Sequence, residues 1–130
     1  MSKQLSVGDT FTHVRECDKY RPIYYAAASG DFNPIHIDPD AGKAAGLGGP
    51  ILQGLCTLSW AVEGVVNHVK DATRIAKVKV RFSRPVMIDD TVTYVGKVTA
   101  IENGKAVFEI SAKNQKGDDV LKGAVVEVRV

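Results

Sequence analysis

Residues 53–69 read QGLCTLSWAVEGVVNHV, and this segment determines how the rest of the chain must pack. Glu63 and His68 are its only acidic or basic side chains, so a helix drawn through it is apolar on nearly every side. Sixteen helical residues would span about 24 Å. A helix of this kind needs other elements to cover it, and we therefore expect it at the centre of the fold.

The second half of the chain has the two-residue periodicity of β-strands. Apolar residues alternate with polar ones, and Asn103-Gly104 is the strongest hairpin signal that two residues can give. Short turns between successive strands predict an antiparallel sheet. With a short opening strand included, the predicted strands are residues 7–14, 74–82, 91–101, 106–112 and 120–130.

Two shorter helices are predicted before the central one. The first covers residues 20–29 and ends at Gly30, and the second covers residues 39–45 with Asp38 as its N-cap. A sheet of about five antiparallel strands and one buried helix pack economically when the sheet wraps the helix. The sequence therefore predicts an α+β domain of the hot-dog type, with residues 1–130 forming a single domain.

Composition narrows the class of protein further. The formal net charge is +2 over 130 residues, which does not call for a nucleic-acid partner. No apolar run approaches the ~20 residues that cross a bilayer, and the polar N-terminus lacks the apolar stretch of a secretory signal, so we expect a cytoplasmic protein without a membrane partner. The exposed edges of one open sheet favour pairing with a second subunit.

The two cysteines give no sign of a disulfide or a metal site. Cys17 and Cys56 have neither CxxC spacing nor histidines at zinc-ligand intervals. Cys56 lies in an apolar segment, where a small buried hydrophobe is a more common role than a nucleophile. We expect no metal ligands.

The segment Ser29-Gly30-Asp31-Phe32-Asn33-Pro34-Ile35-His36 carries the most chemistry. It holds a carboxylate and an imidazole five residues apart on a turn that Pro34 stiffens and that Asn33 can brace by local hydrogen bonds. Asp31 and His36 together could activate one water molecule and return a proton to a substrate. The alternative is purely structural, with Asp31 in an Asx turn and His36 as a hydrogen-bonded surface histidine.

Three further residues are candidates for substrate contacts. Gly54 begins the central helix, where free N–H groups and the helix dipole could stabilise an oxyanion, although it could equally permit close helix–sheet packing. Arg81 and Arg84 could bind the phosphates of coenzyme A, although a solvated sheet face is the more common role for basic residues like those near Arg81.

The motif Gly30-Asp31-Phe32-Asn33-Pro34-Ile35-His36 resembles the hydratase motif of the MaoC-like dehydratases, which include the (R)-specific enoyl-CoA hydratases. The likeness extends in order through residues 25–39, 44–47, 50–55 and 80–86. It implies a hot-dog homodimer with its site near the subunit interface. It also implies reversible hydration of a trans-2-enoyl thioester, of coenzyme A or an acyl carrier protein, to an (R)-3-hydroxyacyl thioester without a cofactor.

The resemblance assigns roles within the motif. Asp31 and His36 would hold the catalytic water, Asn33 would orient the site, and the Gly54 N–H would lie in the oxyanion hole. Gln53 departs from the pattern, since many members carry histidine there, so its predicted substrate contact is less firmly defined. The alternatives are a hot-dog thioesterase and a non-catalytic acyl-thioester binding subunit, and pairing with a different chain stays open.

Overall fold

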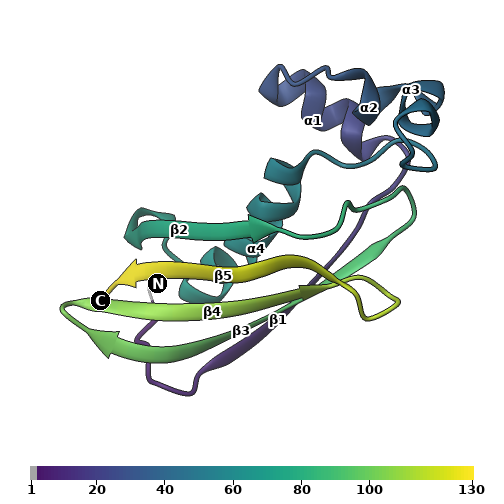
Figure 1. Cartoon of the computed structure of the whole chain (residues 1–130). Helices are drawn as coiled ribbons and strands as arrows, with labels where there is room; N and C mark the ends of the chain where they lie inside the picture. The colour runs from purple at the N-terminus through teal and green to yellow at the C-terminus, as the bar shows by residue number, and fades with distance from the viewer. Residues whose placement is uncertain (1–2) are drawn as a thin grey trace.

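The predicted helices and strands are all present in a computed structural model, which describes residues 3–130 (Figure 1). Two short elements were not predicted: a single helical turn within the Asp31–His36 motif and a 3-10 turn after the central helix. The strands are β1 (Thr10–Glu16), β2 (Ile75–Phe82), β3 (Thr91–Glu102), β4 (Lys105–Lys113) and β5 (Asp119–Arg129). The helices are α1 (Arg21–Ser29), α2 (Pro34–Ile37), α3 (Pro39–Ala44), α4 (Gly54–Val69) and η1 (Ala72–Arg74).

The five strands form one antiparallel sheet in the order β1-β3-β4-β5-β2. The sheet curls around α4, and the helices α1, α2 and α3 gather beyond the N-terminal end of α4 (Figure 1). The β3–β4 turn uses Asn103 and Gly104 at φ values of 52° and 75°, as a two-residue hairpin of type I′ requires. The α+β hot-dog arrangement predicted from the sequence is confirmed.

The core lies between α4 and the concave face of the sheet. The apolar residues predicted on one face of β4 are all buried, and Tyr94 and Phe108 are among the largest fully buried side chains. Tyr94 does not leave its polar end unsatisfied, because its hydroxyl donates to the carbonyl oxygen of Thr57 at 2.7 Å. This bond ties β3 to the first half of α4, close to the end of the helix where the candidate site lies.

Full burial of the central helix is the prediction that the structure corrects. The face of α4 carrying Trp60 and Val65 is buried against the sheet, whereas Leu55 in the first turn is 60% exposed. The alternation predicted for β2 is also incomplete, since Val78 is exposed and Phe82 is 52% exposed. The exposure on β2 has a physical reason, because β2 lies at one edge of the sheet and has a neighbouring strand on only one side among residues 3–130.

Glu63, the unusual acid of the central helix, binds the opposite edge of the sheet. Its Oε1 lies 2.6 Å from His13 Nε2 and accepts a hydrogen bond from Arg15 NH1 at 2.9 Å. The Arg15 guanidinium also lies over the Trp60 ring, 5.1 Å from its centre. Glu63 therefore fastens β1 to α4, away from the Asp31–His36 motif.

Candidate active site

The Asp31–His36 segment folds into a turn that its own side chains brace. Helix α1 ends at Gly30, whose φ of 82° is a conformation that glycine adopts without strain. Asn33 then caps α2, because its Oδ1 accepts the Ile35 N–H at 3.2 Å. The Asn33 N–H in turn donates to Asp31 Oδ1 at 3.3 Å. Asn33 therefore holds the acid and the histidine-bearing turn in one arrangement, as its local bonding capacity predicted.

The His36 imidazole is fixed by a backbone carbonyl. Its Nδ1 lies 2.8 Å from the carbonyl oxygen of Ile51, and its side chain is only 10% exposed. A carbonyl oxygen can only accept, so Nδ1 must carry the hydrogen. In the neutral ring Nε2 is consequently unprotonated, and its lone pair points to the other side of the imidazole.

That lone pair faces the Asp31 carboxylate. Nε2 and Asp31 Oδ2 are 3.6 Å apart, which is too long for a direct hydrogen bond. With neutral His36, both facing atoms are acceptors, and a water molecule donating one hydrogen to each would satisfy both. The geometry of the pair therefore leaves room for a single water hydrogen-bonded to both acceptors. Asp31 is about half exposed, which leaves this position open to solvent and substrate.

Gly54 lies at the first position of α4 and borders the same cavity as His36. Among residues 3–130, no protein group accepts its N–H, whereas the Cys56 and Thr57 N–H groups both bond to the Gln53 carbonyl. A free N–H at a helix N-terminus stabilises negative charge. The cavity has a volume of about 170 Å³ and is lined by His36, Ile51, Leu52, Gly54, Thr57, Phe82, Ser83, Arg84, Pro85, Val86 and Val120.

Gln53 is buried, at 1% exposure, and does not line this cavity. Its Nε2 donates to the carbonyl oxygens of Pro22 at 2.9 Å and Asp31 at 3.5 Å. Its Oε1 has no hydrogen-bond partner among the described residues. The side chain thus joins the start of α4 to α1 and to the backbone of the acid, which is a positioning contact. A direct contact with substrate, as predicted, would require its Oε1.

The two arginines predicted to bind phosphate lie on different faces of the sheet. Arg84 lines the cavity that contains His36 and Gly54. Arg81 belongs to a separate concavity on the outer face. Sequence proximity concealed this separation, because Arg81 lies within β2 whereas Arg84 lies beyond the end of the strand, where the chain bends.

Neither cysteine is suited to nucleophilic chemistry. Both thiols are buried and free. Burial raises the pKa of Cys17 to about 12 and also raises the pKa of Cys56 above its usual value. The reactive thiolate is therefore scarce at neutral pH. The prediction that Cys56 acts as a small buried hydrophobe is confirmed.

His36 also borders a second, larger cavity that the sequence did not predict. It has a volume of about 500 Å³ and lies between the α1–α3 helices and the loop before β3. Its lining residues are Lys19, Tyr20, Ile23, His36, Ile37, Pro39, Pro50 and Ile88. Their contact depends on how the helices fold over the β2–β3 loop, and no motif marks residues so far apart in the chain.

Close packing at Gly42 supports the segment that carries the Ile51 carbonyl. A Cβ atom at Gly42 would overlap the backbone carbonyl of Gly49. We expect Gly42→Ala to lower the free energy of unfolding by about 1–3 kcal/mol, because one backbone segment must move. Gly49→Ala is the matched control, since a Cβ there meets no atom within 4 Å. Urea unfolding of both variants tests this, and equal losses would contradict the assigned contact.

The fold and the site together define a hot-dog domain with a facing carboxylate and imidazole beside the N-terminus of its central helix. Comparison with known families gives the same class. The model of the family described as "MaoC like domain" matches residues 8–119 of this chain. The chain belongs to this family of MaoC-like dehydratase domains.

Individual relatives share both sequence and fold with the chain. The probable enoyl-CoA hydratase 2 of Dictyostelium discoideum is 37% identical over 106 residues, which are 79% of this chain and 35% of that protein. The chain thus spans about a third of the length of this curated relative. The (R)-hydratase of A. caviae superposes with a TM-score of 0.88 at 23% identity, covering 99% of this chain and 100% of that one.

A third comparison involves a complex of two different chains. A chain of the ChsH1–ChsH2 complex from Mycobacterium tuberculosis is 26% identical, with a TM-score of 0.87. The match covers 98% of this chain and 99% of that one. Hot-dog chains of this size and similarity therefore occur in hetero-oligomers.

Proposed function

We propose that this protein catalyses the reversible, (R)-specific hydration of a trans-2-enoyl thioester. The observation that carries the proposal is the 3.6 Å gap between His36 Nε2 and Asp31 Oδ2, two acceptors that a single water would bridge. The free N–H of Gly54, on the same cavity as His36, supplies the second requirement of the reaction. Relatives named as enoyl-CoA hydratase 2 support the substrate. The resemblance of the motif at residues 30–36 to that of the (R)-specific hydratases supports the stereochemistry.

The chemistry follows from these groups. Asp31 accepts a proton from the bridging water as its oxygen bonds to the β-carbon of the substrate. The electrons of the double bond move toward the thioester oxygen, and the Gly54 N–H stabilises that negative charge. The proton then passes from Asp31 to the facing Nε2 of His36, which delivers it to the α-carbon. Water has then been added, and both residues are back in their starting protonation states.

These steps need proton transfer and oxyanion stabilisation, so we propose an enzyme without a metal or redox cofactor. Its substrate would be a coenzyme A or acyl-carrier-protein thioester. Among residues 3–130, no group of three histidine, cysteine or acidic side chains is placed to hold a metal ion. We assign Arg84, on the site cavity, as a contact for the phosphate end of the thioester.

We propose that the protein acts as a homodimer, with the site completed by the second subunit. The site cavity is small in one chain, and the half-exposed Phe82 forms one of its walls. The exposed Leu55 lies on the adjacent turn of α4, and β2 has a free edge. A subunit seated there would cover apolar surface and deepen the cavity. The complex of ChsH1 with ChsH2 makes a different partner chain the alternative.

We place the protein in the cytoplasm. Within residues 3–130, none of the helices is both long and apolar enough to cross a membrane. Several relatives carry the word peroxisomal in their names, so fractionation with a peroxisomal marker is the test that separates the two locations.

Incubation with crotonyl-CoA tests the activity. We expect the ultraviolet absorbance of the enoyl thioester to fall, and an (R)-3-hydroxyacyl dehydrogenase, but not an (S)-specific one, to oxidise the product. A thiol-reactive dye added to the same reaction distinguishes the alternatives. Release of free coenzyme A without loss of the double bond by hydration would show a thioesterase, and binding without turnover would show a non-catalytic subunit.

A further inference from the structure

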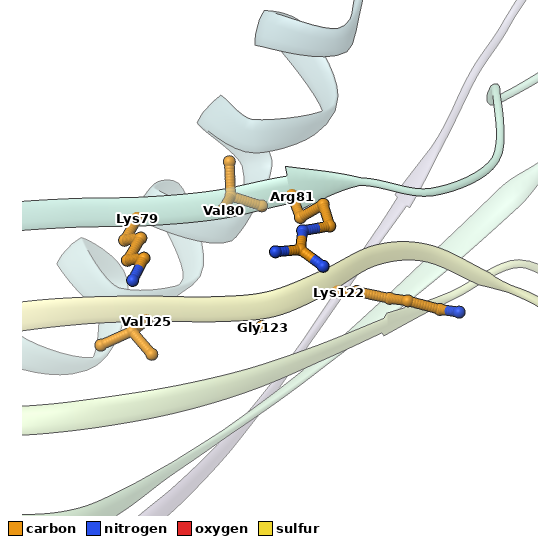
Figure 2. A pocket seen from close by; sticks show the side chains of 6 residues that line it. All are labelled: Lys79, Val80, Arg81, Lys122, Gly123 and Val125. Carbon is orange, nitrogen blue, oxygen red and sulfur yellow. The ribbon is translucent and has the colours of Figure 1, made fainter.

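Three cationic side chains line a concavity on the outer face of the sheet, opposite α4. Figure 2 shows Lys79 and Arg81 extending from β2 toward β5, which contributes Lys122. Val80, between the two cations on β2, turns to the other side of the strand. The concavity has a volume of about 390 Å³, and its remaining lining residues are Val80, Gly123 and Val125.

The positive charges of this pocket are uncompensated. Arg81 and Lys122 are direct cross-strand partners, and like charges placed in this way destabilise a sheet. Within residues 3–130, neither of them nor Lys79 makes an ion pair or a hydrogen bond to a side chain. An anion bound between them would remove a repulsion that the isolated chain retains.

Nearby carboxylates are already engaged by other lysines. Asp119 accepts a hydrogen bond from Lys113 Nζ at 2.8 Å. This bond lowers the pKa of Asp119, and the charge of Lys122 lowers it by a smaller amount. Glu127, further along β5, lies 3.8 Å from Lys77 Nζ. Glu109, which is opposite Val125 on β4, forms no ion pair with the three cations either, so within residues 3–130 they stay available to a ligand.

The backbone makes this site concave. The pairing of β2 with β5 shifts register between Lys79 and Arg81. On β5, Gly123 has a φ of 58° and no side chain, and a Cβ there would meet nothing within 4 Å. A bulge without a side chain lets a ligand approach the strand closely. A compact polyanion fits such a hollow, whereas a flat protein surface would leave it unfilled.

This pocket adjoins the candidate active site around the end of β2. Arg81 and Lys122 lie in the pocket, while the site cavity includes Phe82, Arg84 and Val120, one to three residues away on the same two strands. The Ser83 N–H donates to the Val120 carbonyl at 3.0 Å and closes the rim between the two hollows. A thioester bound at His36 could extend past Arg84 and over this rim.

We propose that Lys79, Arg81 and Lys122 bind phosphate groups on the pantetheine arm of the thioester substrate. This inference rests on the proposed function, which supplies the thioester. Lysines also protect free sheet edges, and that role would account for Lys79 and Arg81 on β2. It does not account for Lys122, because β5 is flanked by strands on both sides.

Equilibrium binding of free coenzyme A to the full chain tests the proposal without requiring turnover. The variant carries Lys79→Gln, Arg81→Gln and Lys122→Gln together. An exposed ion pair changes affinity by roughly threefold at low salt, so we expect about 30-fold weaker binding, shrinking as ionic strength rises. Pantetheine, which lacks phosphate, should bind both proteins equally. Lys97→Gln, on the same outer face of β3, should change neither affinity.

Phosphopantetheine separates the two sources of the phosphate. If it loses affinity in the triple variant along with coenzyme A, the pocket binds the phosphate next to pantetheine, which carrier proteins share. If only coenzyme A loses affinity, the pocket binds the nucleotide phosphates. Equal coenzyme A binding by wild type and variant, or none by either, overturns the proposal. So does weakening confined to a whole acyl carrier protein, which would assign the pocket to a protein surface.

Failure of the proposed function gives a different result. A protein that binds coenzyme A through these cations but hydrates no crotonyl thioester would retain the phosphate site and lose the hydratase assignment. If wild type and triple variant instead hydrate crotonyl-CoA with the same KM, and likewise crotonyl-pantetheine, the hydratase assignment would stand and the phosphate site would be rejected. Circular dichroism of the variant confirms that it folds.

Discussion

Asp31→Asn should lower kcat for hydration of crotonyl-CoA by about 10²–10⁴-fold while leaving the fold intact. The substitution keeps an oxygen that can accept the Asn33 N–H, now 3.3 Å from Asp31 Oδ1, so the turn retains its brace. It removes the group that takes the proton from water. Because Asp31 is about half exposed, no buried charge is lost and stability should change little.

Asp40→Asn is the matched control for this prediction. Asp40 is an exposed carboxylate in α3, close in sequence to the site, and borders neither of the two cavities that contain His36. Its kcat should stay within about twofold of wild type, as for a surface substitution away from the chemistry. If Asp31→Asn keeps wild-type kcat and a native circular dichroism spectrum, the acid–base assignment of Asp31 is wrong.

The elements of the fold were predictable because their signals are local. Period-two alternation located β4, Asn103-Gly104 located its hairpin, and the apolar run at 54–69 located α4. Each pattern depends on residues a few positions apart, which is the range over which strand and helix geometry repeats. The exposed sides of Leu55 and Phe82 were not predictable, because apolar periodicity identifies a face that needs cover without identifying what covers it.

The candidate site was predictable only in part, for a related reason. Asp31, Asn33 and His36 lie within six residues, and the turn that joins them follows from Asn33 and Pro34. The acceptor for His36 Nδ1 is the Ile51 carbonyl, fifteen residues away. Every residue has a backbone carbonyl, so the sequence does not show which one accepts this bond. The cationic pocket likewise joins β2 to β5 through a register that only the folded sheet defines.

His36→Asn should also lower kcat by about 10²–10⁴-fold, and the double variant with Asp31→Asn should lose no more than either single variant. The Asn side chain places an N–H donor close to the position of imidazole Nδ1, which now lies 2.8 Å from the Ile51 carbonyl, and removes Nε2. Two groups that act on one bridging water fail together when either is lost, because the remaining group has no partner in the proton transfer.

If the two residues acted independently, the double variant would have a lower kcat than either single variant. If Asp31 and His36 served separate steps, their losses would multiply, and kcat would fall by the product of the two single effects. Steady-state kinetics of the four proteins, with unfolding curves to confirm their stability, separates the two cases. The 3.6 Å distance from Nε2 to Oδ2 favours the shared water, because neither atom can bond the other directly when His36 is neutral. Multiplicative losses would show that Asp31 and His36 contribute independently and do not share one proton transfer.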